Sequence, residues 1–163
     1  MTGRDVAVVL GASVTGLMAA GALAKAYRRV VVVERDALAT EGPVEARKGV
    51  GQGRHNHNLT PRVARTLARI FDGVHDELRA RGATVCDMGD GLWYVAGRRL
   101  ARTHVGQPQI LASRPLLART LLSRLDALPN VELRDRTDAC GLVVERGRGT
   151  GVRLIGRRDG REE

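Results

Sequence analysis

The stretch Asp5-Val-Ala-Val-Val-Leu10-Gly11-Ala-Ser13-Val-Thr-Gly16 decides the fold class of this chain. An apolar run ends at a glycine, a second glycine follows five residues later, and a helix rich in small residues is predicted over residues 14–27. Val30–Glu34 is then a β-branched run, a pattern typical of parallel strands buried on both faces. Together these segments predict the β-turn-α-β unit of a Rossmann-like α/β domain, with a central parallel sheet flanked by helices.

The glycines and the acid of this unit each have a separate physical role. Gly11 permits a sharp turn out of the strand, Gly16 permits close packing of helix on sheet, and the amide groups at the helix start face a pyrophosphate. Ser13 replaces the usual second glycine, and its small side chain still permits approach of a ligand. Glu34 follows Gly16 by 18 residues, where a carboxylate can accept hydrogen bonds from both hydroxyls of an adenosine ribose. The pattern predicts a dinucleotide site; the alternative is a turn that only packs helix against strand.

Length and composition argue against a membrane protein, an exported protein and a cysteine-bound metal site. The chain has 163 residues and 43% hydrophobic residues, enough for one domain with a core of Val, Leu and Ala. No apolar run approaches the ~20 residues that span a bilayer, and no export signal opens the chain, so we expect no membrane span. Cys86 and Cys140 lie far apart without metal-type spacing, which predicts reduced, partly buried thiols of a cytoplasmic protein. The aromatic residues are few: Tyr27, Phe71, Trp93 and Tyr94.

The charge is strongly basic, with a formal net charge of +9. Of 27 basic residues, only Lys25 and Lys48 are lysines. The arginines stand singly or in pairs among 18 acidic residues, and we expect no stripe of them along one helix face. Because nucleic-acid surfaces normally cluster their charges, no nucleic-acid partner is predicted.

The remaining elements follow from periodicity and turn residues. We expect a long polar, glycine-rich loop over residues 35–58, a helix over about 59–71 that continues beyond Gly73 into Val74–Arg81, and strands at Thr84–Asp87 and Leu92–Ala96 joined by a turn at Gly89-Asp90-Gly91.

The second half contains a helix with clear start signals. Ser113 is a good N-cap and Pro115 stands in the first turn of a helix to about Leu128. The flanking predictions are strands at Gln109–Ala112 and Val131–Arg134, and a hairpin of Leu142–Glu145 with Gly151–Ile155.

His55 and His57 have His-x-His spacing in the long loop. No Asp, Glu or Cys is paired with them at metal-site spacing, so no metal site is predicted. A polar role near a ligand and a role as plain loop histidines both stay open.

Taken together, the motifs resemble the N-terminal part of p-hydroxybenzoate-hydroxylase-like, or group A, FAD-dependent monooxygenases and related oxidoreductases. Four blocks, in this order and across almost the whole chain, carry the resemblance: Val9–Gly16, Val33–Asp36, Arg47–His57 and Ala112–Leu117.

The resemblance implies a role for seven residues. Gly11, Ser13 and Gly16 would line the FAD pyrophosphate, and Glu34 would hold the adenosine ribose. The implied roles of the three arginines are these: Arg35 beside the adenine, Arg47 approaching the cofactor from the loop after the second strand, and Arg114 reaching the pyrophosphate or ribityl region.

By the same resemblance, residues 1–163 form an FAD/NAD(P)-binding Rossmann-like domain without its substrate-binding domain. The implied activity is an FAD-dependent oxidoreductase, a monooxygenase that hydroxylates an aromatic or polyketide-like small molecule with NAD(P)H and O₂. Halogenation or reduction by a flavin, a nicotinamide-dependent dehydrogenase and a truncated, non-catalytic remnant stay open, as does the oligomeric state. No catalytic residue can be named, since flavin chemistry resides in the cofactor. We expect the chain alone to bind FAD weakly or not at all and to have no turnover.

Overall fold

The computed structural model describes residues 4–40, 47, 53 and 55–162 of the chain. The helices are α1 (Val14–Ala24), α2 (Pro61–Ile70), α3 (Val74–Ala80), α4 (Arg114–Asp126) and a short 3₁₀ helix, η1 (Met88–Asp90). The strands are β1 (Arg4–Leu10), β2 (Tyr27–Val33), β3 (Asn56–Leu59), β4 (Thr84–Asp87), β5 (Tyr94–Val95), β6 (Arg98–Arg99), β7 (Pro108–Ser113), β8 (Val131–Arg134), β9 (Thr137–Glu145) and β10 (Arg148–Gly156).

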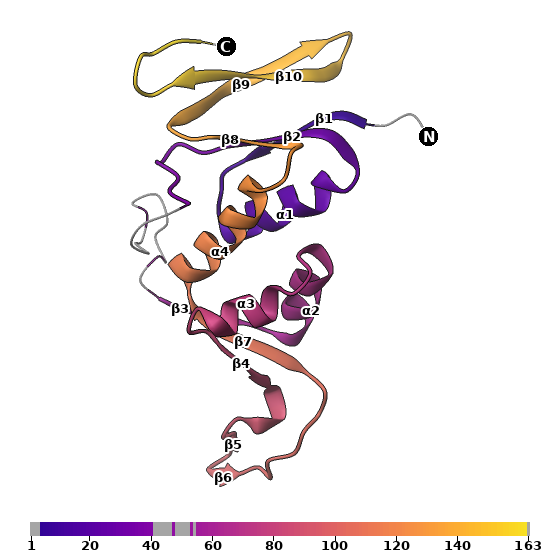
Figure 1. Ribbon diagram of the computed structural model, residues 1–163, viewed down its shortest axis with the longest axis vertical. Coiled ribbons are helices and arrows are strands. Elements are labelled where there is room, and N and C mark those ends of the chain that lie inside the picture. The colour runs from indigo at the N-terminus through magenta and orange to yellow at the C-terminus, as the bar shows by residue number, and fades with distance from the viewer. Residues whose placement is uncertain (1–3, 41–46, 48–52, 54, 163) are drawn as a thin grey trace.

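A parallel sheet with the strand order β1-β2-β8 forms one end of the molecule (Figure 1). Alternate residues of β2 face opposite layers: Val30 and Val32 belong to the core shared with α1 and α4, whereas Val31 and Val33 pack against Leu154 of β10. The predicted α/β class with a parallel sheet is confirmed. Helices cover one face of this sheet, and the antiparallel β9–β10 hairpin lies over the other.

The hairpin covers only part of that outer face. Val8 and Leu10 of β1 lie beside Val31 and Val33 in the sheet register, yet they are exposed, as is Val6. Among the described strands, β1 pairs only with β2 and therefore forms an edge of the sheet. The outer face of β1 is thus an uncovered row of apolar side chains.

A second, antiparallel sheet has the strand order β3-β7-β4. It corrects two expectations. The segment predicted as loop to residue 58 ends in strand β3, and β4 pairs with β7 instead of with residues 92–96. Tyr94–Val95 pairs with Arg98–Arg99 in a small hairpin of its own. Strand β7 is distant in sequence from both β3 and β4, and it pairs with one of them along each of its two edges. Local sequence patterns do not predict such long-range pairing.

Several boundaries differ from those predicted by a few residues. Helix α1 ends at Ala24 because Tyr27 already begins β2, and the Nδ2 group of Asn130 donates to the carbonyl oxygens of both residues, at 2.8 and 3.0 Å. The cap at Ser113 is confirmed, since its Oγ accepts a hydrogen bond from the amide of Leu116 at 3.3 Å. Strand β8 is as predicted, whereas β9 and β10 are both longer than expected.

Aliphatic side chains of α1, α2, α3, α4 and both sheets form the core, with Phe71 as its buried aromatic residue. Thr120 of α4 is fully buried, and its hydroxyl oxygen has no hydrogen-bond partner among the described residues. Both cysteines are free, but only Cys86 is partly buried; Cys140 is exposed, so the prediction of a partly buried thiol there is wrong.

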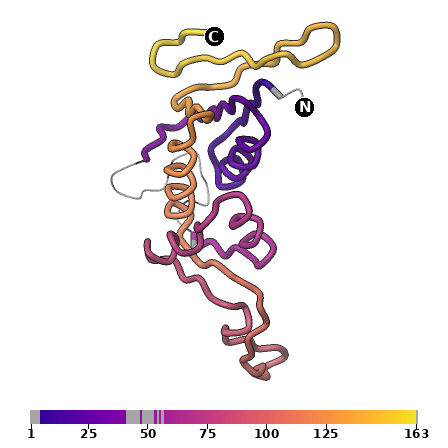
Figure 2. Tube along the Cα trace, turned by 45° about the vertical axis from the view of Figure 1, so that its right-hand side comes forward, coloured from indigo at the N-terminus to yellow at the C-terminus, as the bar shows by residue number. Residues whose placement is uncertain are grey.

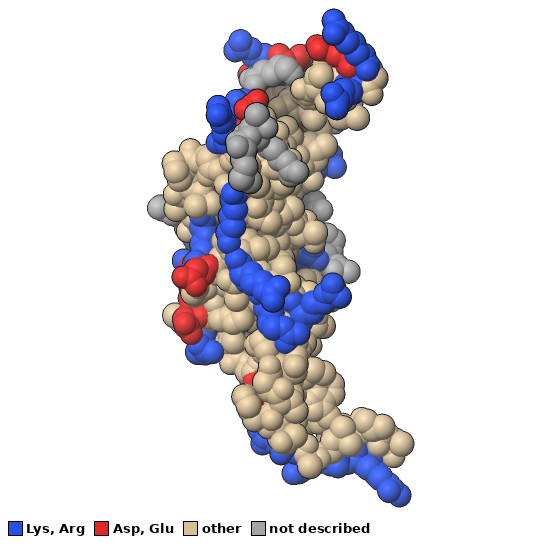
Figure 3. Space-filling model, turned by 90° about the vertical axis from the view of Figure 1, so that its right-hand side faces the viewer, with Lys and Arg blue, Asp and Glu red and all other residues tan. Residues whose placement is uncertain are grey.

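One basic stripe does exist, contrary to expectation. Arg62, Arg65 and Arg69 are exposed and lie three and four residues apart, on one face of α2. Figure 3 shows basic side chains gathered across the middle of the side of the molecule on which α2 lies. No helix within the described residues is long and apolar enough to cross a membrane.

Candidate functional site

The turn between β1 and α1 has the backbone that the two glycines predict. Gly11 has φ +92°, in the left-handed region that favours glycine, and its amide donates to the carbonyl of Val33 at 2.8 Å. A Cβ atom added to Gly16 would lie 2.0 Å from the carbonyl oxygen of Gly11. Any side chain at residue 16 would therefore force the turn and the helix apart.

Ser13 is the N-cap of α1. Its Oγ accepts a hydrogen bond from the amide of Gly16 at 3.3 Å. The serine that departs from the glycine pattern thus stabilises the helix start. The first amide groups of an α-helix have no acceptor within the helix, and together with the helix dipole they favour an anion.

Glu34, directly after β2, is 8% exposed. Its Oε2 accepts a hydrogen bond from the amide of Ala12 at 2.8 Å, and its Oε1 accepts one from the amide of Asp36 at 3.0 Å. The carboxylate therefore ties the end of β2 to the turn before α1.

Arg47 lies against the same carboxylate. Its Nη1 is 3.0 Å from Glu34 Oε2, and its Nη2 donates to the carbonyl oxygen of Ala12. Nη1 is buried and, among the described residues, has no acceptor aligned for a hydrogen bond, although the charge of Glu34 is close. The structure thus joins two residues that the sequence singled out separately, in one ion pair beside the turn.

Arg35 borders a hollow of about 240 Å³ beside this turn. The hollow is lined by Leu10, Gly11, Val33, Glu34, Arg35 and residues 137–139 at the start of β9. The Arg35 side chain is exposed, and its Nε lies 3.9 Å from Asp138 Oδ1. Five of the seven predicted residues therefore lie together: Gly11, Ser13 and Gly16 in the turn, and Glu34 and Arg47 in contact with it. Arg35 lies next to this group.

Arg114 is the first residue of α4 and lies beside His57 of β3, because β3 and β7 pair there. Partial burial and, secondarily, the positive charge of Arg114 lower the pKa of His57 from its usual 6.5. Arg114 is not among the residues that line the 240 Å³ hollow. Of the block Arg47–His57, residues 48–52 and 54 lie outside the described residues.

Sequence reasoning missed the main-chain partners of Glu34 and the contribution of β9 to the hollow. Every residue except proline has a backbone amide, so the residue types at 12 and 36 could not indicate that the amides of Ala12 and Asp36 bind Glu34. β9 reaches the turn only through tertiary structure: the amide of Thr137 donates to the carbonyl of Glu34 at 3.0 Å. No local pattern could have found that contact.

Asp87, Asp90 and His104 bring their side-chain ligand atoms within 4.8 Å of one another, and the sequence did not single them out. The carboxylate of Asp87 already accepts hydrogen bonds from the amides of Gly89 and Val105, both at 2.9 Å, and of Gln107 at 2.6 Å. The hydrogen bond from Val105 is the largest cause that lowers the pKa of Asp87. These contacts give the cluster a structural role in organising its loop.

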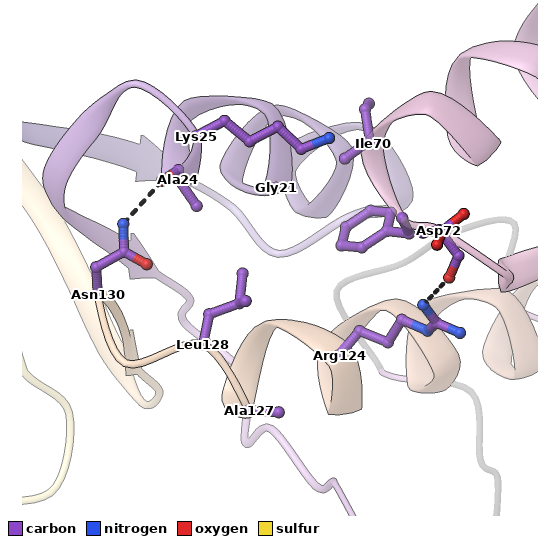
Figure 4. Close-up of a pocket in the computed structure, with 10 residues that line it drawn as sticks. Gly21, Ala24, Lys25, Ile70, Asp72, Arg124, Ala127, Leu128 and Asn130 are labelled. Carbon is purple, nitrogen blue, oxygen red and sulfur yellow. Dashed lines mark hydrogen bonds between the residues drawn. The ribbon is translucent and has the colours of Figure 1, made fainter.

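A larger hollow of about 400 Å³ lies where the C-terminal ends of α1, α2 and α4 meet (Figure 4). The cations at its rim have main-chain partners: Lys25 Nζ donates to the carbonyl of Arg69 at 2.7 Å, and Arg124 donates to the carbonyl of Asp72. Since helix C-termini favour positive charge, these cations stabilise the junction of the helices.

Comparisons with known proteins agree with this architecture. Protein Rv3254 of Mycobacterium tuberculosis is 37% identical over 143 residues, which are 82% of this chain and 30% of that protein. The probable FAD-dependent monooxygenase PqsL of Pseudomonas aeruginosa has a TM-score of 0.66 at 25% identity and matches 98% of this chain with 39% of its own. The chain resembles the N-terminal, FAD-binding part of FAD-dependent monooxygenases.

Other monooxygenase-like structures share the fold at lower identity. The p-nitrophenol 4-monooxygenase PnpA of Pseudomonas putida has a TM-score of 0.62 at 22% identity, and the myxobacterial halogenase CndH has 0.66 at 20%. They match 98% of this chain with 38% and 34% of their own chains. No protein-family model matches the chain. The chain therefore spans well under half the length of the monooxygenase-like proteins it matches.

Proposed function

We propose that this chain is the dinucleotide-binding part of an FAD-dependent oxidoreductase. The observation that carries the proposal is the Glu34–Arg47 pair at the Gly11–Gly16 turn, where one buried guanidinium nitrogen of Arg47 has no aligned acceptor within the part of the chain that the structure describes. A bare helix-packing turn needs no such group, whereas the phosphate oxygens of a dinucleotide would accept its hydrogen bond.

The residues fit FAD in the following way. The pyrophosphate would lie at the start of α1, near Gly11, Ser13 and Gly16, with Arg47 as a counter-charge. Glu34 would accept hydrogen bonds from the ribose hydroxyls, which requires Arg47 to turn from the carboxylate toward the phosphates. The hollow bordered by Arg35 is suited to the adenine, and Arg114 at the start of α4 is left for the pyrophosphate or ribityl region.

We further propose that the full activity is monooxygenation of an aromatic or polyketide-like small molecule, with NAD(P)H as reductant, in the cytoplasm. A bound flavin would supply the redox chemistry with O₂, and the protein would supply position and exclusion of water. The support for this finer proposal is the likeness to monooxygenases named above. A substrate-binding domain is outside residues 1–163 in this proposal, so the chain alone is expected to have no turnover.

A nicotinamide-dependent dehydrogenase is a weaker candidate. In regular doubly wound folds, the second strand leads into another βαβ unit. Here the chain passes from β2 into the antiparallel β3-β7-β4 sheet and returns to pair with β2 only at β8.

Ligand competition on the isolated chain tests the proposal. Because the described contacts surround the ADP half of FAD, ADP and FAD are expected to bind weakly with affinities within roughly tenfold of each other, and ADP should displace FAD. FMN, which lacks the ADP half, should not compete. Absence of saturable ADP binding contradicts the proposal, and tighter binding of FMN than of ADP would place the site elsewhere.

A pair of matched variants assigns the binding to Glu34. Glu34→Gln removes one charge and should weaken ADP binding roughly tenfold to a hundredfold, since hydrogen bonds to charged groups contribute about 1.5–3 kcal/mol. The control is Glu132→Gln in the neighbouring strand β8. Glu132 also pairs with arginines, Arg29 and Arg134, but lies outside the hollow, so this change should leave ADP binding as it is.

A further inference from the structure

The hollow of about 400 Å³ lies at the C-terminal end of α1, whereas the Gly11–Gly16 turn lies at the start of that helix (Figures 2 and 4). Its volume is within the range of pockets that hold small organic molecules. None of the residues proposed above for the dinucleotide lines it. Its apolar lining comes from three helix ends and the segments that follow them: Gly21, Ala24, Ile70, Phe71, Ala127 and Leu128.

The walls of the hollow are closely packed. A Cβ atom added to Gly21 would lie 2.4 Å from Cζ of Phe71 and 2.7 Å from Cγ2 of Ile70, so the end of α2 packs directly on the backbone of α1. At another wall, Nδ2 of Asn130 donates to the carbonyl oxygen of Ala24 at 2.8 Å. The hollow is therefore preformed, which lowers the entropic cost of filling it.

Two cations supply hydrogen-bond donors at its rim. Lys25 Nζ donates to the carbonyl of Arg69 at 2.7 Å and Arg124 donates to that of Asp72, so both head groups lie near the C-terminal end of α2. A lysine ammonium has three N–H donors and a guanidinium has five. Within the described part of the chain, Lys25 uses one donor in this way, and Arg124 uses two, the second on Glu77. Donors without an acceptor thus remain beside an apolar hollow.

The charges around the rim limit what a ligand can carry. Glu77 is shared between Arg124 and Arg81, whose Nη2 lies 2.9 Å from Glu77 Oε1, so it balances the charge of Arg124 only in part. Lys25 and Arg124 therefore favour an anionic head group, and a guanidinium binds carboxylate oxygens well. The partial negative charge of the helix C-termini disfavours a second negative charge on the ligand.

We propose that this hollow binds a small amphiphilic monocarboxylic acid. The carboxylate accepts hydrogen bonds from Lys25 and Arg124, and the apolar body lies against Ala24, Ala127 and Leu128. This site is separate from the Gly11–Gly16 turn and does not depend on FAD binding there.

Three probes that share one apolar body test the head group: phenylbutyrate, the uncharged phenylbutyramide and the cationic phenylbutylamine. Each is titrated into the isotope-labelled chain and followed by NMR. We expect saturable shifts at the amides of Lys25, Ile70 and Leu128 with phenylbutyrate, and roughly tenfold weaker binding of the amide, which lacks the charge. The amine should not bind. No saturable shift with phenylbutyrate overturns the proposal, as does equal or tighter binding of the amide or the amine.

Two pairs of variants assign the binding to this hollow. Lys25→Met should weaken phenylbutyrate roughly tenfold and leave the amide unchanged, whereas Arg148→Met, the same charge change at an exposed residue of β10, should affect neither. Ala127→Phe fills the hollow and should abolish binding of both probes, and Ala22→Phe, at an exposed residue of α1 outside the lining, is its control. Unchanged phenylbutyrate binding in folded Lys25→Met or Ala127→Phe contradicts the proposal.

Competition with ADP separates this site from the proposed dinucleotide site. ADP should not displace phenylbutyrate, because the two sites lie at opposite ends of α1. Displacement by ADP, or phenylbutyrate shifts centred on Gly11 and Glu34, would place the acid in the dinucleotide site and overturn the inference. Absence of ADP binding leaves the expected result with phenylbutyrate as it is.

Discussion

Two buried carboxylates stand at the ends of strands in this molecule, and their surroundings differ. Asp87 at the end of β4 is 7% exposed and accepts three hydrogen bonds from backbone amides of its own loop. Glu34 after β2 is 8% exposed and accepts two backbone hydrogen bonds, while a charged side chain, Arg47, covers it. Backbone amides cannot leave, whereas an arginine side chain can turn away. The first carboxylate therefore holds a fixed structure, whereas the second has a side-chain partner that is free to rotate away.

The largest expected effect on stability comes from removing the structural carboxylate. Asp87→Ala leaves the amides of Gly89, Val105 and Gln107 without their acceptor, so we expect the greatest fall in Tm among these variants and loosening of residues 88–107. Thermal unfolding followed by circular dichroism and by Trp93 emission measures both. Asp5→Asn, at an exposed carboxylate, is the control. An unchanged Tm for Asp87→Ala would remove the structural role assigned to Asp87.

The second expected effect is on ligand binding and involves the movable partner. Arg47→Met removes the cation beside Glu34 and the group proposed to meet phosphate. Binding of ADP should fall roughly tenfold or more, and binding of adenosine much less, because adenosine carries no phosphate charge. Isothermal titration with both ligands measures the ratio. Equal losses for ADP and adenosine would show that Arg47 acts only by positioning Glu34.

Acid unfolding tests the structural role of Asp87 in a second way. Hydrogen bonds from Val105 and other backbone amides lower the pKa of Asp87 below its usual 3.8 in the folded chain. Below pH 3.8 the unfolded chain takes up this proton first, so the stabilising contribution of Asp87 is lost as the pH falls through its folded pKa. Urea unfolding between pH 5 and the acid limit measures the slope, which should be shallower in Asp87→Asn. Identical slopes would contradict the assignment.

A smaller effect concerns His57, near the start of α4. Burial first, and the charge of Arg114 second, hold its pKa below 6.5. Arg114→Gln removes the second cause, so the pKa of His57 should rise part of the way toward 6.5, as followed by NMR titration of the ring protons. A pKa that stays the same would place Arg114 farther from His57 than the structure does.

The smallest effect concerns the buried hydroxyl of Thr120, which has no hydrogen-bond partner among the described residues. Thr120→Val replaces an unpartnered hydroxyl by a methyl group of similar size, so we expect the free energy of unfolding to rise by about 1 kcal/mol. The control is Thr66→Val in α2, where the exposed hydroxyl donates to the carbonyl of Arg62 at 2.9 Å. Denaturant unfolding compares the two; a loss of stability in Thr120→Val would indicate a buried water on that hydroxyl.

Local signals in the sequence predict the part of the candidate site that lies within the β-turn-α-β unit. Gly11, Gly16 and Glu34 belong to one β-turn-α-β unit whose parts are close in sequence, so strand pattern, turn residues and acid spacing reinforce one another. The resemblance implied that Arg47 approaches the cofactor, but its contact with Glu34 was not predicted, because no periodicity connects a loop arginine to a buried carboxylate. The antiparallel sheet was missed for the same reason, since the partner of β3 and β4 is the distant strand β7.

The uncovered edge strand β1 has a practical consequence for anyone who purifies this chain. Unpaired strand edges that carry apolar side chains tend to join edge to edge, and Val6, Val8 and Leu10 give β1 that character. Aggregation of the isolated chain should therefore begin at its first strand. A single lysine at residue 8, on the exposed face of β1, is the change best placed to keep the protein in solution without disturbing the buried side of the sheet.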